Sequence, residues 1–179
     1  SYEEGEMYID GKETSHYLAS DFEEYRKQYI GNIFQHFNLV NSYTVYQNVE
    51  LILRINGYSK ADRKRRIAEI LQRVGLAAYA KTKVSKLSGG QKQRVSIARA
   101  LAKDTDIIVA DEPTGNLDPK NAMEIMQLLE QINLHGTTVI VATHAKEIVN
   151  SMKKRVIAIS NGKLIRDEER GEYYEIPSV

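Results

Sequence analysis

The stretch Leu87-Ser88-Gly89-Gly90-Gln91, followed by the run Ile107–Glu112, decides the fold of this chain. Ser88 is a residue type that commonly caps a helix, and apolar residues recur at helical spacing after it. The two glycines leave backbone N–H groups open at the positive end of that helix, where an anion can approach closely. The sequence therefore predicts a helix whose start is suited to binding an anion.

A second pattern ends in two carboxylates. Ile107-Ile108-Val109-Ala110 is a short apolar run without polar alternation, which is typical of a buried parallel strand. Asp111 and Glu112 follow at the carboxyl end of this strand, where open α/β sheets bind their ligands. An anion-binding helix start and an acidic strand end together indicate phosphate and Mg²⁺ chemistry.

The 179 residues are enough for one domain with a core, so a single α/β domain is expected. Residues 1–41 and 87–179 are predicted to form its core, a mostly parallel sheet with flanking helices. Residues 42–86 carry helical spacing and are interpreted as a helical subdomain inside that core. Within it, Ser59 with Asp62 resembles a capping box, and the Arg63–Arg66 cluster is interpreted as a solvated helix face.

Turn signals predict a β hairpin near each end of the chain. Asp10-Gly11 follows a short strand signal, and Asn161-Gly162 separates two strand-like runs. Between the hairpins, Asp21 could cap a short helix, and Thr137–Ala142 is expected to be a buried strand that delivers His144 at its carboxyl end.

These stretches resemble one family, the nucleotide-binding domain of ABC transporters. LSGGQKQRVSIARAL (87–101) is similar to the signature motif, and IIVADEPTGNLD (107–118) is similar to the Walker B strand and D-loop. The resemblance implies a P-loop NTPase-like fold and an ATPase that uses ATP and Mg²⁺. NIFQHFNLVNSYTVYQNVEL (32–51) resembles the branch that serves lipoprotein release, macrolide or peptide export and cell division.

The resemblance gives four residues roles in catalysis and metal binding. Glu112 would be the general base for the water that attacks the γ-phosphate, and Asp111 would hold Mg²⁺. His144 resembles the switch histidine that contacts the γ-phosphate. Gln35 resembles the Q-loop glutamine, whose amide contacts Mg²⁺ or the attacking water. The ordinary alternatives are a strand-to-turn cap for the acidic pair, a surface or core histidine, and a solvated loop glutamine.

The signature residues would act on nucleotide held by a second copy of the chain. Ser88, Gly89, Gly90 and Gln91 would grip its γ-phosphate in this head-to-tail dimer, as the resemblance implies. Asp118 resembles the D-loop residue at the dimer seam, and it is also a plausible helix cap in front of Pro119. The resemblance further implies integral-membrane permease subunits as partners.

The composition excludes several function classes. The net charge is +1, so no strong field indicates binding to nucleic acid. The chain has no cysteine, which excludes a disulfide framework. No apolar run approaches the roughly 18 residues that a spanning helix needs. We therefore expect a cytoplasmic protein, peripheral on the inner face of the membrane through its partner subunits.

One motif of the family does not occur in these residues, the phosphate-binding loop G-x-x-x-x-G-K-[ST]. Gly11-Lys12 and Gly162-Lys163 lack both the partner glycine and the following Ser or Thr. We interpret the sequence as an N-terminally incomplete ATPase domain that is inactive by itself. One alternative is a nucleotide-incompetent remnant that dimerises with or regulates a complete homologue. Another is the ATPase head of a DNA-repair or chromosome-organising protein, which the absence of heptad arms disfavours.

Overall fold

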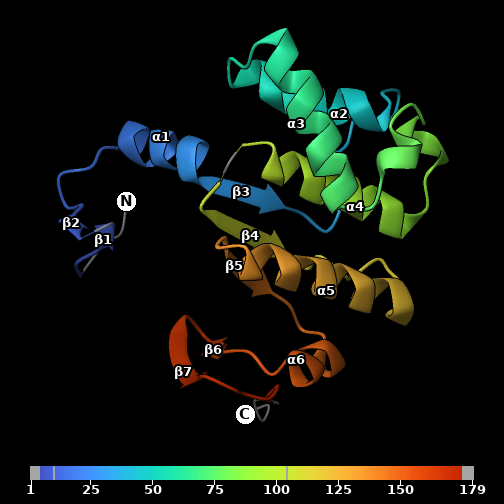
Figure 1. Cartoon of the computed structure of the whole chain (residues 1–179). Coiled ribbons are helices and arrows are strands. Elements are labelled where there is room, and N and C mark those ends of the chain that lie inside the picture. The colour runs from blue at the N-terminus through green and yellow to red at the C-terminus, as the bar shows by residue number, and fades with distance from the viewer. Residues whose placement is uncertain (1–4, 10, 104, 175–179) are drawn as a thin grey trace.

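A three-stranded parallel sheet forms the centre of the computed structural model, which describes residues 5–9, 11–103 and 105–174. Its strands are β3 (Ile30–Ile33), β4 (Ile107–Asp111) and β5 (Thr138–Ala142), in the order β3-β4-β5. Ile33 pairs with Ala110, and Asp111 pairs with Ala142. The carboxyl ends of all three strands therefore lie along one edge, which confirms the predicted α/β class (Figure 1).

Helices cover one face of this sheet. α4 (Gly89–Leu101) lies against β3, α5 (Pro119–Leu134) lies against β5, and the two helices contact each other. Figure 1 shows α2 (Val45–Ile55) and α3 (Lys60–Arg73) on the far side of α4 from the sheet, which matches the contacts that both make with α4. The short helices η1 (Ala77–Tyr79) and η2 (Val84–Lys86) lead into α4.

The other face of the sheet is left uncovered by the part of the chain that the structure describes. Ile33 and Ala110 point to the covered face and are buried. Val141, which pairs with Ala110 on the same face, is half-buried. On the opposite face, Val109 is half-buried, and its partner Ile140 is 53% exposed. The sequence predicted β5 as a buried strand, and this is wrong: no element in the described residues covers its outer face.

Side-chain caps fix the helix starts in the region 42–86. The Ser59 hydroxyl accepts a hydrogen bond from the Asp62 N–H at 3.2 Å, as the capping-box resemblance predicts. Thr44, which the sequence analysis did not single out, caps α2 reciprocally with Gln47. The predicted helical character of this region is confirmed, and its boundaries as a subdomain remain a prediction.

The basic cluster on α3 is less solvated than predicted. Arg63 is half-buried, and its guanidinium donates to the Tyr58 carbonyl at 2.7 Å and lies 3.4 Å from Glu50. The Arg66 guanidinium stacks over the Tyr58 ring at 4.6 Å. These contacts attach α3 to the loop before it, because long basic side chains can pack their stems while keeping charge near water. Lys64 and Arg65 are exposed as predicted.

The N-terminal elements are a hairpin and a helix. β1 (Tyr8–Ile9) and β2 (Lys12–Glu13) pair as predicted, while Asp10 of their turn lies outside the described residues. α1 (Ala19–Tyr29) begins after Leu18. Asp21 is therefore not its N-cap. It lies inside the first turn, where its carboxylate accepts the Leu18 N–H at 2.7 Å.

The C-terminal elements are α6 (Lys146–Met152) and the antiparallel hairpin of β6 (Val156–Ser160) and β7 (Lys163–Glu168). This hairpin was predicted from its Asn161-Gly162 turn. In the described residues, β6 pairs only with β7, and β5 pairs only with β4. None of the helices in the described ranges is long and apolar enough to cross a membrane.

Candidate functional site

The acidic end of β4 holds two of the predicted catalytic residues in contact. The Glu112 carboxylate accepts the His144 backbone N–H at 2.9 Å, and His144 Nδ1 lies 2.6 Å from Glu112 Oε1. The Thr143 hydroxyl donates to the other carboxylate oxygen at 3.2 Å. The side chain of His144 is 79% exposed, whereas that of Glu112 is 20% exposed. A half-buried carboxylate is thus oriented by the end of the neighbouring strand, and His144 Nε2 is not used by this contact.

The backbone at Glu112 is unusual, with φ at 44°. A non-glycine residue adopts this left-handed conformation only when its surroundings hold it there. The Glu112 N–H donates to the Ala142 carbonyl at 2.9 Å, and the Glu112 carbonyl accepts from the Gly115 N–H at 3.2 Å. These bonds continue the pairing with β5 by one residue and start the tight turn that contains Pro113.

Asp111 and Gln35 lie at the same edge of the sheet. Asp111 is the exposed last residue of β4, and Gln35 follows β3 by two residues. Gln35 lies against Gly115: a Cβ added to this glycine would be 2.8 Å from Gln35 Nε2. The Gln35 carbonyl accepts a hydrogen bond from the Asn116 side chain at 3.0 Å. The predicted Q-loop residue is therefore held directly on the loop that resembles the D-loop.

Ser88 begins α4 as a reciprocal cap. Its hydroxyl oxygen accepts the Gln91 N–H at 3.3 Å, and the Gln91 side chain accepts the Ser88 N–H at 3.0 Å. Ser88 is exposed, so its hydroxyl can still donate a hydrogen bond to a ligand while its oxygen accepts the Gln91 N–H. Gly90 is buried instead, because a Cβ there would be 2.6 Å from the Asn121 side chain. At least one signature glycine is thus also required for packing.

Asp118 caps α5 as predicted. Its carboxylate accepts the Asn121 N–H at 3.1 Å, and hydrogen bonds from the Asn121 side chain and backbone lower the pKa of Asp118. The preceding residue, Leu117, lies close to Gly89, where an added Cβ would be 3.2 Å from it. The start of α5 and the start of α4 therefore pack together.

Contacts link Gln35, Asp118 and the signature residues 88–91 into one continuous group. Gln35 contacts the loop at Gly115, this loop leads to Asp118, and the start of α5 touches the start of α4. Sequence reasoning missed Asn116 and Asn121, which make these connections. It also missed Gln93, a buried residue of α4 whose side chain reaches Pro113. The signal that could have found Gln93 is its position on the buried face of the predicted helix.

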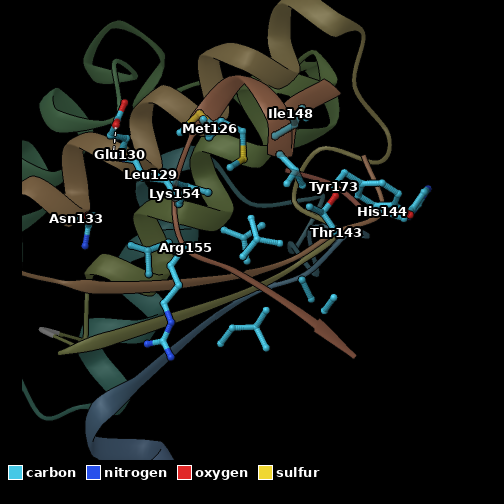
Figure 2. A pocket seen from close by; sticks show the side chains of 18 of the residues that line it. Met126, Leu129, Glu130, Asn133, Thr143, His144, Ile148, Lys154, Arg155 and Tyr173 are labelled. Carbon is cyan, nitrogen blue, oxygen red and sulfur yellow. Dashed lines mark ion pairs between the residues drawn. The ribbon is translucent and has the colours of Figure 1, made fainter. Parts of the chain in front are cut away.

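A cavity of about 720 Å³ lies between β5 and α5 on one side and β6 and α6 on the other (Figure 2). Apolar side chains from these four elements line it, among them Met126, Val139, Val141, Ile148 and Val156. Thr143 and His144 also line it. The cavity therefore extends to the strand end that holds Glu112.

A parallel sheet with an acidic strand end, a contacting histidine and a capped, glycine-containing helix start is the arrangement of a nucleotide-hydrolysing α/β domain. Comparison with known proteins identifies the family within this class. The family model described as "ABC transporter" matches residues 1–115. The chain belongs to the ABC transporter ATP-binding family.

Two curated relatives illustrate the similarity. The chain is 47% identical to the cell division ATP-binding protein FtsE of Bacillus subtilis over 169 residues, which are 94% of the chain and 74% of that relative. It is 42% identical to the methionine import ATP-binding protein MetN of Escherichia coli K12 over 177 residues, which are 98% of the chain and 51% of that relative. The chain thus spans three quarters of one relative and half of the other.

Solved structures agree with the fold. The dimeric ATP-binding cassette MJ0796, in a post-hydrolysis state bound to ADP and Pi, aligns with a TM-score of 0.77 at 39% identity, over 96% of this chain and 75% of that one. The cbiO1 protein of Clostridium perfringens, part of the ABC transporter complex cbiONQ, aligns with a TM-score of 0.82 at 31% identity, over 91% and 65%. An ABC ATPase cassette is therefore the fold of this chain.

Proposed function

We propose that this chain is the ATP-hydrolysing part of an ABC subunit that works as a head-to-tail dimer and drives integral-membrane permease subunits from the cytoplasmic face of the membrane. The observation that carries the proposal is the contact between Glu112 and His144 at the end of β4. The dimeric cassette MJ0796 and the complex-forming cbiO1 support the dimer and the partner subunits by analogy.

Glu112 acts as the general base. Two hydrogen bonds from residues 143 and 144 fix its carboxylate, so that it can orient a water molecule and accept its proton. His144 holds the same carboxylate through Nδ1, which leaves Nε2 to face the phosphate. The exposure of the histidine and the partial burial of the acid fit these roles, because one must reach the substrate and the other must hold a fixed position.

Asp111 and Gln35 are the residues that would hold Mg²⁺, which would neutralise charge on the phosphates. The donor set fits this ion in part. In the described ranges no group of three or more His, Cys, Asp or Glu side chains could hold a metal alone. One carboxylate and one amide oxygen at the sheet edge suit an ion that takes its other ligands from water and phosphate oxygens.

Ser88, Gly89, Gly90 and Gln91 act on the nucleotide of the second copy. The exposed Ser88 hydroxyl and the N–H groups at the start of α4 present donors to the γ-phosphate. Asp118 would lie at the seam between the two copies, and its exposure in the single chain supports this role. Its packing onto the start of α4 through Leu117 and Asn121 keeps both contact surfaces in register.

We further propose that tight ATP binding needs a phosphate-binding loop besides residues 1–179, and that these residues alone are inactive. The position of the cavity supports this proposal, because the cavity could hold such an element. In the described residues β5 and β6, which flank it, are each paired along one edge only. Ile157 in its lining is 52% exposed, and the lining reaches His144. A strand and helix added there would cover apolar surface and bring a phosphate loop to Glu112. Titration of ATP into the 179-residue chain and into the full-length gene product tests this, and equal tight binding by both would contradict it.

Replacing Glu112 with Gln tests the base. In the full-length gene product, Glu112→Gln keeps the shape of the side chain but removes proton acceptance, so hydrolysis should fall about 10²–10⁴-fold. ATP binding should persist, and a dimer should accumulate in ATP. Phosphate release and size-exclusion chromatography measure these outcomes.

The matched control is Glu50→Gln on α2. Glu50 is similarly half-buried and pairs with Arg63 at 3.4 Å, but it is neither one of the site residues nor part of the cavity lining. This variant should hydrolyse ATP at the parental rate. Parental activity in Glu112→Gln would show that another group is the base.

A further inference from the structure

Gln93 is a fully buried polar residue on α4 that the proposed mechanism does not use. Its side chain is 0% exposed, and its Nε2 donates a hydrogen bond to the Pro113 carbonyl at 2.7 Å. Gln93 lies two residues after Gln91, in the same two turns of helix that Ser88 caps. One side chain thus joins the helix that begins at the signature residues to the turn that follows Glu112.

The turn needs such an anchor. Glu112 is in a left-handed conformation. Pro113 has no N–H, so the peptide group between Glu112 and Pro113 cannot donate a hydrogen bond. Among the hydrogen bonds of the described residues, the carbonyl of Pro113 is reached only by Gln93. The neighbouring carbonyls of Glu112 and Thr114 are instead bonded within the turn, to the N–H groups of Gly115 and Leu117.

The other polar atom of the Gln93 side chain, Oε1, does not contribute to stability. This atom is buried and has no hydrogen-bond partner in the described structure. An unpaired buried acceptor carries a desolvation penalty that offsets the gain from the Pro113 bond. A methionine of similar length would fill the same space without that penalty. The specific effect of glutamine is therefore to hold one carbonyl in place.

α4 is attached to its neighbours directly after Gln93. Arg94, the next residue, donates to the Val74 carbonyl at 3.2 Å and pairs with Glu124 on α5 at 3.0 Å. The first two turns of α4 are joined by helical hydrogen bonds, so the positions of the Ser88 cap and of Gln93 depend on each other.

We propose that Gln93 is a positioning residue that couples the two nucleotide sites of the dimer. The inference rests on the proposed function, in which Ser88 serves the nucleotide of the second copy while Glu112 serves the nucleotide of its own copy. Contact of a phosphate with the start of α4 then acts through Gln93 and Pro113 on the position of the Glu112 carboxylate. Each site is set for hydrolysis when the other one is occupied.

The test is Gln93→Met in the full-length gene product. The side chain keeps its volume and loses its donor, so kcat for ATP should fall about tenfold while KM stays within about twofold. The Hill coefficient for ATP should fall towards one, because the link between the sites is lost. A kcat within about twofold of the parental value, or an unchanged Hill coefficient, would overturn the proposal.

Ser96→Ala is the matched control, because Ser96 is another buried polar residue of α4 and no described hydrogen bond links it to residues 112–115. It should leave kcat and KM unchanged. Equal losses in both variants would indicate general loosening of α4, and the positioning role would be wrong.

Amide hydrogen exchange gives a second readout that does not depend on activity. In Gln93→Met the amides of Gly115 and Leu117 should exchange about tenfold faster, since their turn has lost its anchor, while those of Ser96→Ala should not change. Unchanged exchange in Gln93→Met would overturn the proposal. A parental protein without ATPase activity would contradict the proposed function instead, and exchange alone would then decide the role of Gln93.

Discussion

Residues 33–132 and residues 138–174 are built from similarly apolar sequences but are buried to very different degrees. Every buried hydrophobic side chain of the described core lies between Ile33 and Ile132. In the second region, β5 and β6 carry continuous apolar runs, yet Ile140, Ile157 and Ile159 are 53%, 52% and 67% exposed. The apolar pattern of the second region therefore suits more burial than the described residues provide.

The difference follows from how each strand is flanked. β4 has a parallel partner on both sides and helices on one face, so Ile108 and Ala110 are completely buried. Among the described residues β5 and β6 each have one partner strand, and a cavity lies between them. A strand with an unpaired edge and an open face gains little from its apolar residues. Burial in a sheet thus depends on neighbours more than on the strand's own sequence.

The largest expected effect is a contrast in stability between the two regions. Leu53→Ala, at a completely buried position on α2, should lower the free energy of unfolding by about 2–5 kcal/mol. Ile159→Ala, on β6, should change it by no more than about 0.5 kcal/mol, because the side chain is already largely in water. Urea unfolding of the 179-residue chain measures both. Equal losses would show that the C-terminal hairpin is covered in solution.

A smaller effect is expected in amide hydrogen exchange. Amides of Ile157 and Ile159 in β6 should exchange about tenfold or more faster than those of Ile108 and Ala110 in β4, because local opening of a singly paired strand disrupts fewer contacts. Mass spectrometry or NMR of the 179-residue chain can compare them. Similar protection in both strands would contradict the contrast.

The smallest effect concerns pH and the start of α5, inside the well-packed region. Hydrogen bonds from Asn121 lower the pKa of Asp118 below its ordinary value. Asp118 therefore contributes stability above the pKa of an unfolded aspartate, and the contribution is lost as the pH falls through the lowered value. The difference in melting temperature between the parental chain and Asp118→Asn should shrink as the pH drops below about 4.

Asp167, in the terminal hairpin, can be compared with Asp118 by the same measurement of melting temperature. Hydrogen bonds from Arg155 lower its pKa in the same direction, and both residues are exposed. Because an exposed ion pair is screened by salt, added salt should reduce the effect of Asp167→Asn more than that of Asp118→Asn. The reverse order would mean that the hairpin is more sheltered than the cap.

Local signals predicted most of the fold. The cap at Ser88, the cap at Asp118 and the apolar run at 107–110 each depend on a few neighbouring residues, and each appears where it was expected. The turn of the C-terminal hairpin at Asn161-Gly162 was predictable for the same reason. Asp21 was misplaced because a carboxylate can satisfy the start of a helix from inside the first turn as well as from the capping position.

Long-range contacts could not be predicted in this way. Nothing in the sequence near Gln35 indicates that it lies on Gly115, and nothing near Gln93 indicates the bond to Pro113. The sequence placed Glu112 and His144 at the ends of two strands and family resemblance supplied their expected roles, but their direct contact was not predicted. The exposure of β5 could not be predicted from its own residues, since an apolar run is the same whether or not a neighbour covers it.

The left-handed backbone at Glu112 limits what evolution or engineering can place at this position. Glycine and asparagine relax most easily into that geometry, but neither can take up a proton from water. Aspartate could, yet its shorter arm would pull the carboxylate away from His144. Glutamate therefore combines a strained backbone with the side-chain length that proton transfer needs. A substitution that relieves this strain should give a more stable protein without ATPase activity.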